Sequence, residues 1–232
     1  MDWEKILPSL IGGGISAVTA VIMFSLAQWI DSRKRAAERK RSAAHDAYGG
    51  LLKLVRSGDS IENLARHIDK QIKDAHELNR DFSDIAAIIQ PILGASILVE
   101  DLTAQETRFL TKSDGEFLSR IWEIQQRARN NDVIAAEYSK FRLAYDAFIE
   151  TKAPSITAIE GATLSVSLEG DDAKIATIKL GRLNQIIVPL IASLDEDRKT
   201  IVTVIDEYIA FARSAFGDDF PAKKFEARAR KC

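Results

Sequence analysis

An uncharged run of 25 residues near the N-terminus constrains this chain more than any other feature. No acidic or basic side chain lies between Ile6 and Ile30. A helix of about 20 apolar residues is long enough to cross the roughly 30 Å hydrocarbon core of a bilayer. Residues 31–41 follow with six Lys or Arg and two acids. Because a cationic segment beside a span stays on the cytoplasmic side, the sequence predicts a single-pass protein of a bacterial inner membrane, with its N-terminus outside and its C-terminal domain cytoplasmic.

Two other interpretations of this run remain open. The first is a cleaved signal peptide, for which Ser25-Leu26-Ala27 offers a small-x-small site. A signal peptide needs a positive leader and an apolar core of roughly 7–15 residues. This leader instead carries Asp2 and Glu4 against Lys5, and the run is longer. The second interpretation is a buried helix of a soluble protein, which seldom extends so far without a charge.

Two tryptophans flank the predicted span at a separation typical of a membrane. Trp3 and Trp29 are 26 positions apart, which corresponds to roughly 39 Å along a helix, and tryptophan favours both membrane–water interfaces. The alternative is that one of them is a packed aromatic. Each cationic residue that follows is attracted to anionic lipid by about 1 kcal/mol near the surface. The predicted membrane-surface contacts are therefore Trp3, Trp29, Arg33, Lys34, Arg35, Arg39, Lys40 and Arg41.

Small residues recur at four-residue spacing inside the predicted span. Small side chains on one helix face let two backbones approach closely, and such packing drives helix association in lipid. Glycine and alanine are also common in membrane helices that do not associate. We expect a homo-oligomer that forms through one or both of two faces, Gly12/Ser16/Ala20 and Gly13/Ala17.

Charge is distributed unevenly along the chain. The formal net charge is −2, but residues 31–41 sum to +4, residues 42–216 to −7 and residues 217–232 to +2. Phosphate binding requires a basic face, so the acidic body argues against nucleic acid as a partner and favours a protein partner. The single cysteine, Cys232, allows no intrachain disulfide and fits a reducing compartment.

Helical periodicity runs through most of the remaining sequence. We expect an all-α protein in which a single N-terminal transmembrane helix, residues 1–31, continues into a basic juxtamembrane helix, residues 32–56. A cytoplasmic antiparallel bundle of about six helices with coiled-coil-like packing is expected over residues 57–217, followed by a basic C-terminal tail at 218–232. That tail has two interpretations, a segment that rests on anionic membrane and a solvated end.

Turn and capping residues divide the predicted bundle into helices. Gly49-Gly50 is expected to loosen the juxtamembrane helix, and Ser57-Gly58-Asp59-Ser60 to form a turn. Thr103 with Glu106, and Ser113 with Glu116, have the spacing of capping boxes that open helices. Asn130-Asn131-Asp132 is expected to break the chain between two helices. The helix after the first turn should bury Ile61, Leu64, Ala65, Ile68, Ile72, Ala75 and Leu78, which follow a spacing of three to four residues.

Two apolar segments carry a proline that should kink a helix. One helix is expected from Ser83 through Pro91 to Val99, and another from Asp172 through Pro189 to Leu194. A last helix from Asp195 should end at Gly217. It should turn Ile201, Val204, Ile205, Tyr208, Phe211 and Ala212 inward, and an aromatic stripe of Tyr138, Phe141, Tyr145 and Phe148 should pack into the core.

The segment around residues 153–180 is compatible with a loop, a hairpin or a helix. Leu164, Val166 and Leu168 alternate with hydroxyl residues, which is a strand pattern, and residues 174–180 offer a partner strand. In a chain this helical, the preferred interpretation is a loop or broken helix followed by a helix from Asp172.

No catalytic, cofactor-binding or metal-binding signature occurs in the sequence. The histidines His45, His67 and His76 have no metal-ligand spacing, and no phosphate-binding loop is present. The favoured function is a non-enzymatic membrane-anchored scaffold or sensor that self-associates and binds a protein partner. A pore-forming or membrane-perturbing effector is the alternative, and an enzyme with unpatterned residues is third.

Overall fold

The computed structural model describes residues 3–77, 84–92, 99–112, 115–152, 158–160, 163–165 and 168–221; the side chains of 3–20, 111–112 and both strands are not described. Three long helices dominate: α1 (Trp3–Glu77), α4 (Gly115–Lys152) and α5 (Gly170–Phe216). The protein is therefore helical, as the sequence predicts. The exception among the described residues is one antiparallel hairpin of two three-residue strands, β1 (Ala158–Glu160) and β2 (Thr163–Ser165).

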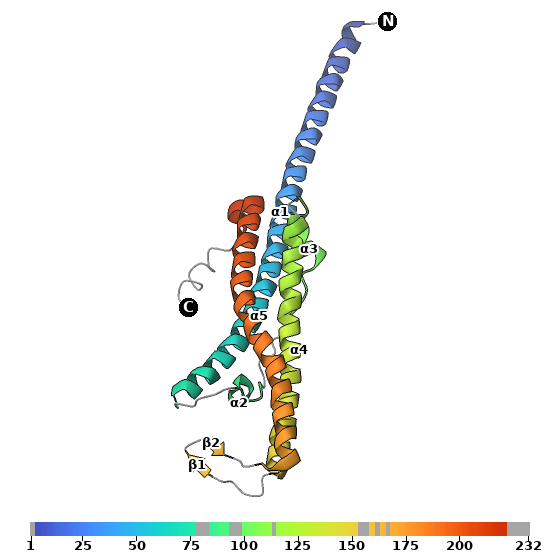
Figure 1. The fold of residues 1–232 in the computed structure, drawn as a ribbon. Helices are drawn as coiled ribbons and strands as arrows, with labels where there is room; N and C mark the ends of the chain where they lie inside the picture. The colour runs from blue at the N-terminus through green and yellow to red at the C-terminus, as the bar shows by residue number, and fades with distance from the viewer. Residues whose placement is uncertain are drawn as a thin grey trace.

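Helix α1 is much longer than the part of it that packs against the other helices. Its 75 residues correspond to roughly 110 Å at 1.5 Å per residue. The N-terminal part extends alone beyond the ends of α4 and α5 (Figure 1). Every side chain from Val21 to Ser42 is exposed, and the first buried one is Ala44. The described side chains from Val21 to Ser42 therefore gain no tertiary packing against the body.

The core lies where α1 from Ala44 onward meets α4 and α5. Helix α5 runs antiparallel to both: Tyr208 reaches Ala47 and Arg198 reaches Glu62 on α1, while Arg120 pairs with Glu207 and Lys152 with Asp172 across α4 and α5. The largest fully buried side chains, which hold these helices together, include Tyr138, Tyr208, Phe117, Leu51, Leu54 and Ile61.

Short elements connect α1 to α4 and end α5. They are α2 (Ile85–Ile88), α3 (Ala104–Thr107), the 3₁₀ turn η1 (Arg108–Lys112) and, after α5, the 3₁₀ turn η2 (Gly217–Asp219). Two α4 side chains hold the α2 region: Tyr138 donates to the Ile89 carbonyl at 2.7 Å, and Arg142 donates to the Ala86 carbonyl. Carbonyls left without helical partners are thus satisfied by buried side chains.

The predicted turn at Ser57–Ser60 is wrong, because α1 continues through it. Ser57 donates to the Lys53 carbonyl one turn back, and Ser60 donates to the Asp132 carboxylate on α4. A Cβ at Gly58 would lie 3.3 Å from Ile201 Cγ1. These small residues are present because α4 and α5 pack closely here, and tertiary contact outweighs their local preference for a turn.

Other predicted breaks are also absent. Helix α4 continues through Asn130–Asp132, where the buried Asn131 amide donates to Asp197. Helix α5 is uninterrupted at Leu194 and Asp195, contains Pro189, and includes residues 174–180, which therefore form no strand. The described residues thus contain three long helices instead of about six. Burial of the polar side chains at the expected breaks explains the difference.

The segment before α3 differs from the predicted helix over 83–99. Only Ile85–Ile88 is helical among its described residues, and Pro91 lies in the non-helical stretch that follows, so it kinks no helix. Residues 93–98 lie outside the described part, as do Leu78, Ser113 and residues 222–232 of the tail. At 158–165 the structure has a hairpin, so the preferred loop or broken helix is wrong there.

Several predictions are confirmed. The apolar residues expected inside the segment 61–75 are buried or packed against the core, and so are those expected on the last helix. The Thr103/Glu106 capping box forms in both directions, and Gly217 ends α5 with a φ of 62°. The aromatic stripe is confirmed only in part: Tyr138 is buried and Tyr145 packs against the core. The prediction is wrong for Phe141, which is exposed, and the half-buried Phe148 contacts Lys179 on α5.

Candidate membrane and self-association site

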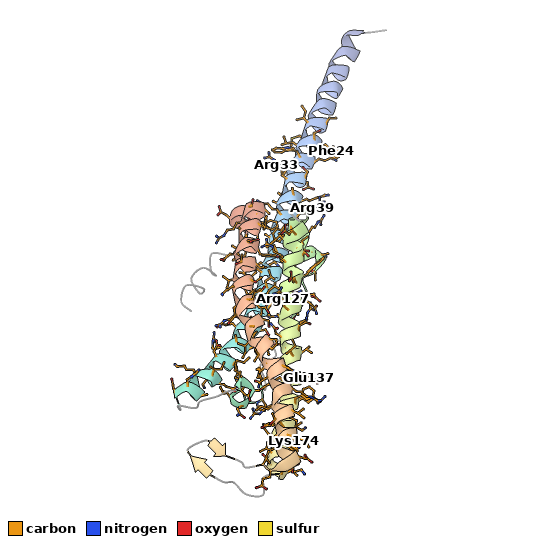
Figure 2. All side chains as sticks on the ribbon, in the orientation of Figure 1. Phe24, Arg33, Arg39, Arg127, Glu137 and Lys174 are labelled. Carbon is orange, nitrogen blue, oxygen red and sulfur yellow. The ribbon has the colours of Figure 1, made fainter. Side chains whose placement is uncertain are left out.

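The protruding half of α1 carries an apolar belt on all sides. Between residues 21 and 30 the large apolar side chains are exposed, and Phe24 retains 65% of its accessible surface. Figure 2 shows Phe24 on the part of α1 that projects beyond the other helices. A helix that is apolar around its whole circumference normally lies in a protein core or in a membrane. The exposed members are Val21, Ile22, Met23, Phe24, Leu26, Trp29 and Ile30.

A cationic segment follows directly on the same helix. The Arg33 guanidinium lies 3.9 Å from the centre of the Trp29 ring, a cation–π contact at the boundary between the apolar and the charged parts. One turn apart, Arg35 and Asp31 form an exposed ion pair at 3.3 Å. Such exposed pairs contribute little to stability, about 0–1 kcal/mol, so these charges remain available to an external partner.

The far end of the cationic segment touches the body. Lys40 Nζ lies 3.5 Å from an Asp219 carboxylate oxygen in η2, and the neighbouring Phe220 packs edge-on against Tyr48 with ring centres 6.3 Å apart. The described chain therefore ends beside the cationic segment of α1. The predicted basic tail, residues 218–232, begins in this part of the chain, and its residues 222–232 lie outside the described part.

One face of the protruding helix carries a shallow groove that is open to its surroundings. All of its lining residues come from α1, so it is a furrow between side chains and encloses nothing. Small residues alternate with large ones along it: Phe24, Ala27, Gln28, Asp31, Ser32, Arg35, Ala36 and Arg39.

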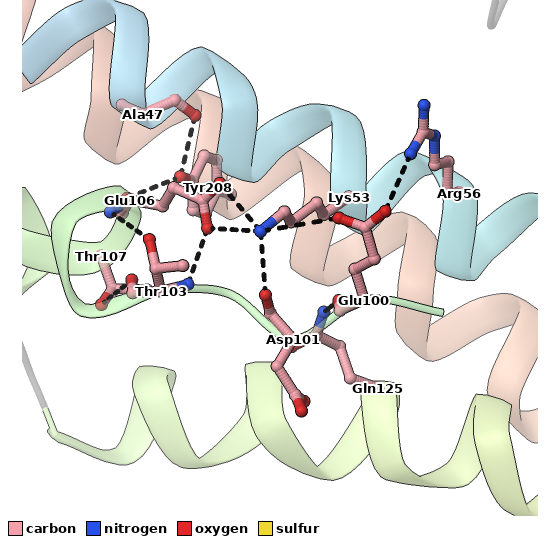
Figure 3. Close-up of polar contacts among 10 residues, drawn as sticks. All are labelled: Ala47, Lys53, Arg56, Glu100, Asp101, Thr103, Glu106, Thr107, Gln125 and Tyr208. Carbon is pink, nitrogen blue, oxygen red and sulfur yellow. Dashed lines mark hydrogen bonds and ion pairs between the residues drawn. The ribbon is translucent and has the colours of Figure 1, made fainter. Parts of the chain in front are cut away.

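A polar cluster fastens α1 to the connection before α3 (Figure 3). Lys53 Nζ donates to the Asp101 carbonyl and to Glu106 Oε2, both at 3.1 Å, and lies 3.8 Å from Glu100. The Glu106 carboxylate also accepts from the Thr103 backbone as part of the capping box. A half-buried lysine with three oxygen partners holds this connection against the helix.

Close approach of α5 to α1 depends on Gly50. The Tyr208 hydroxyl hydrogen-bonds the Ala47 carbonyl at 2.9 Å and the Glu106 carbonyl at 3.0 Å. A Cβ at Gly50 would lie 2.4 Å from that hydroxyl oxygen. Burial raises the pKa of Tyr208, so its hydroxyl remains protonated. Gly50 therefore provides space for Tyr208 and does not loosen the helix.

In the part of the chain that the structure describes, no group of three His, Cys, Asp or Glu could hold a metal ion, and His45, His67 and His76 are exposed. One helix among the described residues, Gly170–Asp219, is long and apolar enough to cross a membrane, with a mean hydropathy of 1.3 over its best window. That test relies on length and composition alone, and core helices pass it as well.

The predicted site residues fall into two groups. The side chains of Trp3, Gly12, Gly13, Ser16, Ala17 and Ala20 lie outside the described part, although α1 includes their backbone. Trp29, Arg33, Lys34, Arg35, Arg39, Lys40 and Arg41 are all exposed on the protruding helix. Sequence reasoning missed the groove, although the sequence contains a pattern that points to it. Residues at alternating intervals of four and three positions lie on one helix face, and this pattern runs through Gly13, Ala17, Ala20, Phe24, Ala27 and Asp31. It also missed the Lys53–Glu106–Tyr208 cluster, whose members are too distant in sequence to suggest contact.

Comparison with known proteins found no matching family, no similar curated protein and no similar solved structure.

Proposed function

We propose that this chain is a membrane-anchored scaffold or sensor. Its first 30 or so residues cross a membrane with the N-terminus outside, and the three-helix body lies in the cytoplasm. The observation that carries the proposal is the exposed apolar belt of residues 21–30, followed at once by exposed cations. In water, a belt of this size would be an unusually large apolar patch. In lipid it is favourable, and the adjoining cations prefer the cytoplasmic surface.

A continuous helix between membrane and body suits a sensor. Helix α1 has no break between Val21 and the core that begins at Ala44. Rotation or displacement of the anchor would therefore be transmitted along a stiff rod to the Lys53–Glu106–Tyr208 cluster. A flexible linker would not transmit such a movement to the body. The acidic body, at −7 over residues 42–216, is then the surface that meets a protein partner.

Fractionation and protease protection test the anchor. The full-length chain should sediment with membranes, and protease added outside intact spheroplasts should leave the body undigested. Val21→Asp combined with Ile22→Asp should move the chain toward the soluble fraction, because a carboxylate within the hydrocarbon costs about 2.5–3.5 kcal/mol.

A matched control separates this effect from a general effect of added charge. Val133→Asp with Val202→Asp alters two equally exposed apolar residues of the body and should leave the chain in the membrane. A wild-type chain that remains soluble after lysis, or a body that external protease digests, would refute the proposal.

The second candidate is a pore-forming or membrane-perturbing effector that oligomerises through its transmembrane helix. One observation favours it: α5 is also long and apolar enough to span a membrane, so two helices would be available for insertion. Against it, α5 contributes eleven buried residues to the body, including the charged Asp197. Overexpression distinguishes the two functions, because a pore collapses the membrane potential and a scaffold leaves it intact.

A further inference from the structure

We propose that the C-terminal segment of this chain, residues 222–232, binds the anionic phospholipid headgroups of the membrane that holds α1. This inference rests on the proposed membrane anchor and adds a second contact with the same bilayer. Basic segments close to a membrane are attracted to the negative surface potential of its cytoplasmic leaflet. The segment carries one acid, Glu226, and five cations, which are Lys223, Lys224, Arg228, Arg230 and Lys231.

The structure fixes the point from which this segment leaves the body. Phe220 is 4% exposed and packs edge-on against Tyr48 of α1. The neighbouring Asp219 pairs with Lys40, which lies on the N-terminal side of Tyr48 along α1. The end of α5 lies beside the part of α1 from which the protruding helix extends (Figure 1). The segment therefore starts at the end of the body that faces the proposed membrane.

From this point the segment is long enough to reach the membrane surface. Tyr48 lies 15 positions after Arg33, the first cation beyond the apolar belt, and this separation corresponds to about 22 Å along α1. The eleven residues of the segment span up to about 36 Å when extended, at about 3.3 Å per residue. About seven residues cover the gap, so positions from Arg228 onward can lie on the headgroups. Lys224 reaches no closer than about 12 Å.

The charges around the departure point favour lipid over the adjoining part of the chain. Residues 31–41 of α1 sum to +4, and Arg39, Lys40 and Arg41 are exposed there. The segment 222–232 also sums to +4, so the two cationic segments repel each other. Anionic headgroups at the membrane surface neutralise both at once. Binding to the acidic body of the same chain is the competing outcome, and it requires no lipid.

The native Cys232 allows a direct test, because it is the only cysteine of the sequence. The full-length chain is labelled there with a fluorophore and reconstituted into vesicles whose lipids carry a quencher at the headgroup. We expect severalfold more quenching in vesicles that contain phosphatidylglycerol than in vesicles of phosphatidylcholine alone. The difference should disappear at about 1 M salt, where the Debye length falls to about 3 Å.

A label elsewhere on the body controls for a general effect of the lipid. Glu150 is exposed near the C-terminal end of α4, and this end of α4 is the one far from the protruding helix (Figure 1). A fluorophore at Glu150→Cys in a Cys232→Ser background should remain unquenched in both kinds of vesicle. Quenching at both positions would mean that the whole body lies on the membrane, and it would overturn the proposal.

Two variants with the same loss of charge test the reach of the segment. Arg228→Gln with Arg230→Gln removes two cations from the part that can touch the headgroups, and should abolish most of the lipid-dependent quenching. Lys223→Gln with Lys224→Gln removes two cations nearer the body, more than about one Debye length of 10 Å from the surface at about 0.1 M salt, and should have a smaller effect. Equal losses for the two variants would contradict the reach on which the proposal depends.

Flotation of the same vesicles separates the segment from the anchor. If the chain floats with both kinds of vesicle but the Cys232 label is quenched equally in both, or in neither, the anchor stands and the contact of the segment with lipid is wrong. A segment bound to its own acidic body gives this result. If the chain floats with neither kind, the proposed anchor fails and this inference fails with it.

Discussion

At the scale of single residues, close packing explains positions that local preference would assign differently. Gly50 and Gly58 occur within a continuous helix, where glycine costs up to about 1 kcal/mol relative to alanine. Each faces a large α5 side chain at short distance, Tyr208 and Ile201 respectively. At Gly50 the local cost is accepted because the helices approach more closely than a Cβ would allow, whereas at Gly58 a Cβ would make a tight contact with Ile201.

Gly50→Ala should therefore destabilise the body. The new Cβ would overlap the Tyr208 hydroxyl, and overpacking of this kind costs about 1–3 kcal/mol. Gly49→Ala is the matched control, because its Cβ would meet only Glu106 Oε1 at 3.4 Å; it should be neutral or stabilising. Urea denaturation followed by circular dichroism measures both.

A double variant tests the cause of this effect. Tyr208→Phe removes the hydroxyl and two hydrogen bonds, so alone it should cost about 1 kcal/mol. Combined with Gly50→Ala it should cost less than the sum of the two single changes, since the overlap is relieved. Additive losses would show that the Gly50 contact is not with the hydroxyl.

The Glu62–Arg198 pair should make stability depend on pH. Hydrogen bonds from Arg198 hold the pKa of Glu62 below its ordinary value of 4.5. A carboxyl whose pKa is lower in the folded state stabilises the fold above its unfolded pKa, and this stabilisation is lost as the pH falls through the folded value. The stability difference between wild type and Glu62→Gln should therefore shrink as the pH falls below about 4.5. Denaturation curves at pH 7 and in that acidic range measure it, and a difference that does not change with pH would contradict the assignment.

At the scale of elements, α4 and α5 are joined by a buried polar contact where the sequence predicts two chain breaks. Asp197 is 1% exposed and accepts from Asn131 at 2.7 Å and from Arg127 at 3.2 Å. Asn131 and Asp197 lie in segments whose composition favours turns or helix ends. Paired across the interface, they instead allow both helices to continue.

Asp197→Ala should consequently destabilise the protein by about 3–5 kcal/mol, because it leaves the buried Asn131 amide and part of the Arg127 charge without a partner. The neighbouring Glu196 pairs with the same Arg127 but is 68% exposed. Its replacement by alanine should cost about 0–1 kcal/mol. Equal losses for the two variants in urea denaturation would show that burial is not what matters here.

At the scale of the whole molecule, the body and the projecting half of α1 are energetically separate. Every described core residue lies at or beyond Ala44, and every described side chain from Val21 to Ser42 is exposed. A chain that begins at Asp31 should retain the unfolding free energy of the body. It should also move from the membrane to the soluble fraction. Loss of helical circular dichroism beyond the removed residues, or a lower unfolding free energy, would contradict this separation.

The sequence alone was sufficient for the helical class, the apolar faces within 61–75 and 201–212, the capping box at Thr103 and the end of α5 at Gly217. It also contains the uncharged run and the cationic segment on which the proposed membrane anchor rests. These features depend on periodicity and on residues near one another in the chain, so the local sequence specifies them.

Only the tertiary structure decided which turn-like segments remain helical. Ser57–Ser60, Asn130–Asp132 and Asp195–Asp197 resemble breaks because their side chains compete with helical hydrogen bonds. Each instead contributes a residue that meets a partner more than 60 positions away, as in Ser60 with Asp132 and Asn131 with Asp197. A buried polar group needs its partner in space, and that partner is not visible in the local sequence. The described residues therefore form three long helices where local patterns predict about six.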